Sequence, residues 1–250
     1  MADPMHQFEI QQVLELPTVA GFDLSITNSA LWMMISAACV TLFFAAASAK
    51  AAVVPGRLQS VGEMLYELIH DLTDSIIGHE GKRYFPFIFT LFAFILAMNL
   101  LGMVPYFFTS TSQLAVTATL GVLVIAVVIA VGFARNGLGF FKLFVPSGVP
   151  FFVLPLVVVI EIISFLVRPV TLALRLFGNM VGGHVVLKVF GGFVVSLGAL
   201  GALGVVGALV TLTGTVAITA LEFMVAFLQA FVFAVLACVY LNDVVNLHSH

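Results

Sequence analysis

Charged residues are scarce in this chain of 250 residues. Only 8% are Asp, Glu, Lys or Arg, whereas 62% are hydrophobic. Soluble domains carry about 25% charged residues, so an ordinary water-soluble domain is excluded. The net charge is −3 at pH 7, and no basic stretch is present. The composition therefore gives no support to a nucleic-acid partner.

Cysteine and the motifs of soluble catalysis are equally rare. Cys39 and Cys238 both lie in apolar runs, where we expect small packed or lipid-facing side chains that say nothing about redox compartment. The sequence has no Walker A motif, nucleophile elbow or Cys/His cluster. We therefore expect no ATP-hydrolysing site, cofactor or metal in this chain. The first 25 residues lack Lys, Arg and an apolar leader, so we expect no cleaved signal peptide.

Long apolar runs are abundant, and they predict an all-α membrane protein with about five crossing helices. A transmembrane barrel would instead alternate apolar and polar residues in strands of about 10. Three runs have the length of one crossing, at residues 28–49, 84–108 and 114–134. Residues 60–77 have apolar side chains at helical spacing, followed by Gly78 as a stop signal. We expect a short amphipathic surface helix there.

The last two apolar units, at residues 150–190 and 201–241, are too long for one upright crossing. At 1.5 Å per residue each helix would be about 60 Å long, twice the hydrocarbon thickness. Either each unit splits, the first near Pro169, or each is one steeply tilted helix. Proline usually kinks rather than ends a membrane helix, which favours tilt. The turn of the resulting antiparallel hairpin is predicted at Gly191, Gly192, Gly198 and Gly201.

The basic residues outside the apolar runs predict the orientation. If the chain crosses the membrane five times, six basic residues fall on one side. The other side has the acidic N-terminal tail (residues 1–27) and a polar turn at residues 108–113, and its only basic residue is Lys188 near a helix end. Cytoplasmic loops carry the excess of Lys and Arg, so we expect the N-terminus outside and the C-terminus in the cytoplasm. The residues of the basic side are Lys50, Arg57, Lys82, Arg83, Arg135 and Lys142.

The polar face of the amphipathic segment is acidic. Helices that bind lipid headgroups are usually basic, so an acidic face suits contact with protein or with solvent. The sequence leaves these two open. The acidic residues are Glu63, Glu67, Asp71 and Asp74.

Polar side chains form a stripe on each long unit. Residues seven apart are nearly two helical turns apart and share one face. In the hairpin the two stripes can run near each other and form a polar track for a proton or another ion. The first stripe holds Glu161, Arg168, Arg175 and Asn179, and the second holds Glu222 and Gln229.

Arg175 is the most informative member of these stripes. An arginine in hydrocarbon costs from about 3 to well over 10 kcal/mol, and no carboxylate stands three or four residues from Arg175. A structural role in joining helices stays open for any single residue, but the set as a whole favours a path. His184 lies off the main stripe. It could titrate near neutral pH or pair with Glu222 across the hairpin, whereas haem ligation lacks a second intramembrane histidine.

Three segments resemble subunit a of F-type ATP synthases, of the alphaproteobacterial type. They are residues 168–180 (RPVTLALRLFGNM), residues 98–105 (MNLLGMVP) and the pair LQAFVF and VYL within residues 228–241. The resemblance covers most of the chain. It implies a stator in the bacterial inner membrane, beside a ring of c subunits and held by b-type peripheral-stalk subunits. It also implies two aqueous half-channels that reach a carboxylate on the ring.

Carried over by position, Arg175 matches the family's essential arginine. In some bacterial relatives the acid and histidine of positions 184 and 222 are exchanged, which supports a pair. An acid found in some relatives after the second crossing is replaced here by residues 102–104, GMV. The main alternative, a stand-alone ion or proton transporter or channel, predicts inverted repeats and broken helices, which are not apparent. The implied channel positions are Glu161, Asn179, His184, Glu222 and Gln229.

Overall fold

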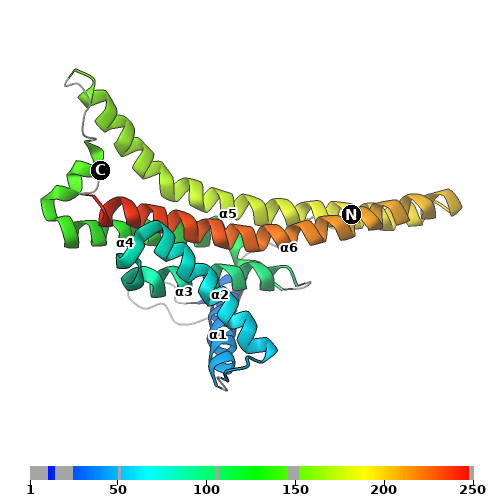
Figure 1. Ribbon diagram of the computed structural model, residues 1–250. Helices are drawn as coiled ribbons and strands as arrows, with labels where there is room; N and C mark the ends of the chain where they lie inside the picture. Colours follow the sequence, from blue (N-terminus) through cyan, green and yellow to red (C-terminus); the bar gives the residue numbers. More distant parts are fainter. Residues whose placement is uncertain (1–10, 15–24, 50–51, 105–106, 146–151, 248–250) are drawn as a thin grey trace.

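A computed structural model describes residues 11–14, 25–49, 52–104, 107–145 and 152–247, and long helices dominate it (Figure 1). The predicted all-α membrane class is confirmed. Most of the acidic tail, Lys50 and Pro150 lie outside the described residues. Five helical segments are long and apolar enough to cross a membrane: Asn28–Ser48, Arg57–Gly102, Leu114–Phe144, Leu154–Gly198 and Gly204–Val245.

Helix α1 (Asn28–Ser48) follows a small antiparallel sheet that the sequence analysis did not predict. Strand β1 (Gln12–Leu14) pairs with β2 (Ile26–Thr27) immediately before the helix. The Thr27 hydroxyl accepts a hydrogen bond from the Ala30 N–H at 3.3 Å, which caps the first turn. The sheet and the cap fix where the first crossing begins.

Helix α2 (Arg57–Ile77) is the amphipathic segment and begins three residues earlier than predicted. Its four acidic residues are exposed, whereas Ile69 and Ile77 are buried. Gly78 ends the helix with φ of 77° and donates its N–H to the Asp74 carbonyl, a conformation that glycine adopts without steric cost. A single 3-10 turn, η2 (Gly78–Glu80), then leads into the next helix.

Helix α3 (Gly81–Gly102) supplies much of the buried core, and it ends six residues before the predicted limit. Helix α4 (Leu114–Asn136) follows a short 3-10 turn, η3 (Ser110–Ser112), and continues into η4 (Gly137–Phe144). A Cβ at Gly121 of α4 would stand 2.7 Å from the Pro169 carbonyl oxygen. The glycine therefore permits the close approach of α4 to the next helix.

Helices α5 (Leu154–Gly198) and α6 (Ala202–Val245) form the long hairpin, and α5 continues through Pro169. The predicted turn was wrong in part, because Gly191, Gly192 and Gly198 belong to α5 and only residues 199–201 connect the helices. Apolar surroundings explain the difference, since backbone groups in lipid need hydrogen bonds within their own helix. The turn itself uses Gly201 at φ of 84°.

The hairpin is longer than a bilayer is thick. Helix α5 has 45 residues and is therefore about 67 Å long at 1.5 Å per residue. In Figure 1 α5 and α6 lie side by side for most of their length, whereas α1 runs across their direction. Helix α1 and the hairpin cannot both stand along one membrane normal, which is the geometry expected of a tilted hairpin.

Polar contacts tie several helix ends together at one end of the bundle. Arg135, at the end of α4, pairs with Glu80 of η2 at 2.8 Å. The Asn136 side chain donates to the Val244 carbonyl at 2.7 Å, and the Asn246 side chain donates to the Ile77 carbonyl at 3.3 Å. The corner between α2 and α3 and the ends of α4 and α6 therefore form one end of the molecule.

Candidate functional site: a buried histidine–glutamate pair and an exposed arginine

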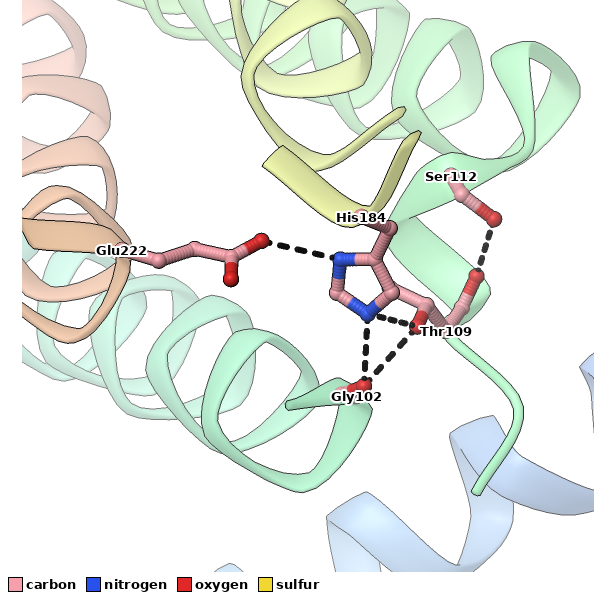
Figure 2. A network of polar contacts seen from close by, with 5 residues as sticks. All are labelled: Gly102, Thr109, Ser112, His184 and Glu222. Atoms are coloured by element: carbon pink, nitrogen blue, oxygen red, sulfur yellow. Dashed lines mark hydrogen bonds and ion pairs between the residues drawn. The ribbon is translucent and has the colours of Figure 1, made fainter. Parts of the chain in front are cut away.

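The centre of the site is a contact between the two long helices. His184 of α5 and Glu222 of α6 approach each other with Nδ1 and Oε1 3.0 Å apart, and their side chains are 14% and 6% exposed (Figure 2). A Cβ on Gly183 would collide with the Glu222 carboxylate. Glycine beside the histidine therefore makes room for the acid, and the pairing considered from the sequence is present in the structure.

The other ring nitrogen fixes the protonation of the histidine. Nε2 of His184 lies 2.9 Å from the Gly102 carbonyl oxygen and 3.0 Å from the Thr109 hydroxyl, which itself donates to the Gly102 carbonyl at 3.0 Å (Figure 2). A carbonyl only accepts, and the Thr109 proton is already used. Nε2 must therefore carry a hydrogen and donate it.

One further proton is then shared along the contact between His184 Nδ1 and Glu222 Oε1. On Nδ1 it gives an imidazolium beside a carboxylate, and on Oε1 it gives a neutral imidazole beside a carboxylic acid. Both states keep the hydrogen bond. A hydrogen bond that allows the proton on either atom is suited to pass it on.

The hydroxyl-rich turn that supports His184 is deeply buried. Its Thr109, Ser110, Thr111 and Ser112 are at most 3% exposed. The Ser112 hydroxyl donates to the Thr109 carbonyl at 2.6 Å, and the Ser110 hydroxyl donates to the Ser29 carbonyl at 3.2 Å. Four consecutive hydroxyl residues between two apolar crossings were the signal in the sequence, but they were predicted only as a turn.

Two more buried polar side chains, Asn99 on α3 and Gln229 on α6, lie near Glu222 in the sequence or the fold. The Asn99 amide donates to the carbonyl of Ala226 at 3.1 Å, a residue between Glu222 and Gln229 on the same helix. Asn99 Oδ1, Glu222 Oε2 and Gln229 Nε2 have no hydrogen-bond partner in the described part of the chain. Buried polar atoms are nearly always hydrogen-bonded, so these three atoms are suited to hydrogen-bond with water. Asn99 was not among the predicted site residues.

Arg175 lies at the surface, in contrast to these buried side chains. It is exposed on α5, as is Asn179 one turn further, and neither side chain has a hydrogen bond or ion pair with any described residue. Within the described residues, no hydrogen bond or ion pair therefore joins Arg175 or Asn179 of the predicted first stripe to the His184–Glu222 pair. Arg175 faces outward, where a second molecule can approach it.

The remaining members of that stripe have separate surroundings. Arg168 donates to the Asp243 carboxylate at 3.0 Å, and its guanidinium lies 4.7 Å from the centre of the Tyr240 ring. Asp243 was not predicted as a partner. Glu161 is half-buried and has no ion pair within the described ranges. Across those ranges no cluster of three or more His, Cys, Asp or Glu side chains could hold a metal ion.

The fold and the site define a multi-pass α-helical membrane protein. Its two longest helices hold a buried histidine–glutamate pair and an exposed arginine that has no ion-pair partner among the described residues. The sequence profile of one family, the ATP synthase A chain, matches residues 30–242. The chain therefore belongs to the ATP synthase subunit a family, as the sequence resemblance indicated.

Individual relatives agree with that assignment. The chain is 55% identical over 249 residues to ATP synthase subunit a of Rhizobium johnstonii, covering 100% of this chain and 99% of the relative. It is 52% identical over 244 residues to ATP synthase subunit a of Mesorhizobium japonicum, covering 98% of this chain and 96% of the relative. The similarity thus extends over essentially the whole length of both proteins.

Proposed function

We propose that this chain is the proton-translocating stator subunit of an F-type ATP synthase. Family membership over residues 30–242 and full-length identity of 55% to a subunit of that complex support the proposal. The observation that carries the mechanism is the contrast within the hairpin. His184 and Glu222 form a buried hydrogen-bonded pair, whereas Arg175 is exposed and has no ion-pair partner among the described residues.

The proton path starts at the outer side. Protons reach the His184–Glu222 pair past the buried hydroxyl turn, and they pass to a carboxylate on the neighbouring c ring. The polar side chains of Asn99 on α3 and Gln229 on α6 line the way. The neutralised ring carboxyl can then turn through lipid at low cost, whereas the charged form cannot.

Arg175 separates this path from the one that leads to the cytoplasm. A fixed cation favours the ionised form of a carboxylate that arrives beside it, and its charge repels protons that would cross directly. Arginine suits the task because it stays protonated even when it is desolvated. Asn179 lies one turn along the same exposed face, and half-buried Glu161 assists proton release at the cytoplasmic end of α5.

The proposed partners follow from the same surfaces. The c ring covers the exposed apolar and cationic face of α5, and b-type stalk subunits hold the stator in place. The exposed acidic face of α2 is available to protein or solvent. The location is a bacterial inner membrane, with the N-terminus outside and the C-terminus in the cytoplasm. The contacts of Arg135 with Glu80 and of Asn246 with Ile77 support one shared end for Lys82, Arg83, Arg135 and the end of α6.

A stand-alone transporter or channel is the alternative function. Such folds are built from inverted repeats, and their sites form where helices are broken. Helices α5 and α6 are continuous through every polar residue of the site. Their continuity and the family membership both favour the stator.

The test is Arg175→Ala in the whole ATP synthase complex, reconstituted in liposomes under an imposed proton gradient. We expect coupled ATP synthesis to be abolished, because the ring carboxylate loses its counter-charge and protons leak between the half-channels. Arg135→Ala is the matched control, since it removes an arginine whose partner is Glu80 and should retain synthesis. Near-wild-type synthesis by the Arg175→Ala complex would overturn the proposal.

A further inference from the structure

A second arginine stands on α5 two helical turns from Arg175, and the structure neutralises it. We propose that Asp243 acts as the counter-ion of Arg168, so that Arg175 works without a rival cation. Asp243 then affects proton transfer only through Arg168, whose charge it neutralises. The inference rests on the proposed stator function.

The geometry of the pair leaves little freedom to the guanidinium. Nη1 of Arg168 lies 3.0 Å from Oδ2 of Asp243, and the two side chains are 22% and 30% exposed. The guanidinium carbon also lies 4.7 Å from the Tyr240 ring centre and 5.6 Å from that of Phe165. Tyr240 and Asp243 are three residues apart and share one face of α6. That face therefore draws Arg168 toward α6.

The two arginines differ sharply although the sequence pattern treats them alike. They are seven residues apart and so lie about 10 Å apart along one side of α5. Arg168 has a carboxylate and two aromatic rings, whereas Arg175 has neither a hydrogen bond nor an ion pair among the described residues. Because Arg168 is only partly exposed, salt screens its pairing less than it would a surface ion pair.

An unneutralised Arg168 would interfere with the ring. A ring carboxylate that leaves Arg175 for the cytoplasmic side moves toward the level of Arg168. A free cation there would attract the ionised carboxylate and hold it at a second position. Two opposite unit charges about 10 Å apart in a poorly solvated site attract each other strongly enough to slow the departure of the ring carboxylate about tenfold. Because Asp243 neutralises Arg168, the ring carboxylate has no second position at which it is held.

The decisive comparison is Asp243→Asn against Asp243→Asn combined with Arg168→Gln. Both are made in the whole complex, and ATP synthesis in liposomes is divided by the amount of assembled complex. We expect the single variant to fall about tenfold, because Arg168 becomes a competing cation, and the double variant to return to within about twofold of wild type. A purely structural ion pair would change the amount of assembled complex and leave synthesis per assembled complex near wild type in both variants.

Two controls separate this inference from the function on which it rests. Glu80→Gln breaks the other described arginine pair, with Arg135, away from α5, and should leave synthesis per complex within about twofold of wild type, as expected of an exposed ion pair. If Arg175→Ala complexes still made ATP, the stator function itself would fail. If they were inactive while Asp243→Asn complexes worked normally, only the role of Asp243 would be overturned.

Failure of the single variant to assemble would leave the double variant to decide. The double variant lacks both charges. Synthesis within about twofold of wild type would therefore support neutralisation as the role of Asp243, because a neutral surface substitution has an effect of about that size. An assembled double variant with a tenfold loss would overturn it.

Discussion

Within the hairpin, the surroundings of His184 and those of Arg175 are opposite in kind. Around His184 the chain supplies both ring nitrogens with partners from α3, α6 and the turn before α4. Around Arg175 it supplies no hydrogen bond or ion pair within the described residues. The groups proposed to transfer protons within the chain are thus held by the chain, whereas the group proposed to act on another molecule is left for that molecule to complete.

Glu222→Gln should break the first half of this comparison and have the largest effect. The amide keeps the size and a hydrogen bond but cannot accept the shared proton. A lost acid–base group typically costs about a hundredfold in rate, and we expect a fall of that order in ATP synthesis per assembled complex. Loss of assembled complex with a normal rate per complex would instead indicate a structural link between α5 and α6.

Gly178→Asp should break the second half by giving Arg175 a partner on its own helix. Residues three apart on a helix are neighbours, and a Cβ on Gly178 meets no atom within 4 Å, so the side chain fits. We expect synthesis to fall at least about tenfold, because the new carboxylate competes with that of the ring. Gly178→Asn, equal in size but uncharged, should fall much less, and equal losses would contradict the electrostatic reason.

Thr109→Val should sharpen the comparison with a smaller effect. It removes one acceptor of the His184 Nε2 hydrogen and leaves the Gly102 carbonyl. One hydrogen bond contributes about 1 kcal/mol, so we expect synthesis to fall about fivefold, with recovery in Thr109→Ser. Thr117→Val is the matched control, because that buried hydroxyl bonds only the backbone at the start of its own helix. Equal effects of the two valine variants would exclude a specific role for Thr109.

The sequence was a good guide to whatever depends on one helix or on a short connection. Apolar run lengths gave the crossings, and the tight hairpin made a contact between His184 and Glu222 foreseeable. Glycines misled the turn prediction, because Gly191 and Gly192 weaken a helix in water but not enough to end one whose backbone must stay bonded in lipid.

Contacts between distant segments were not foreseeable from a single sequence. Thr109 meets a histidine 75 residues away, and Arg168 meets a carboxylate 75 residues away. No periodicity relates such positions, since helix packing brings them together. The seven-residue stripe correctly put Arg168 and Arg175 on one helix, but it could not tell that one is neutralised and the other is not.

The exposed position of Arg175 also bears on how the protein is made. A newly inserted chain would present this charge toward lipid, at a cost of about 3 to more than 10 kcal/mol. Association with a partner that carries a carboxylate relieves that cost, so the residue proposed to direct protons would also favour assembly. A subunit left alone would remain marked as incomplete by its own functional arginine, which membrane quality-control proteases could recognise.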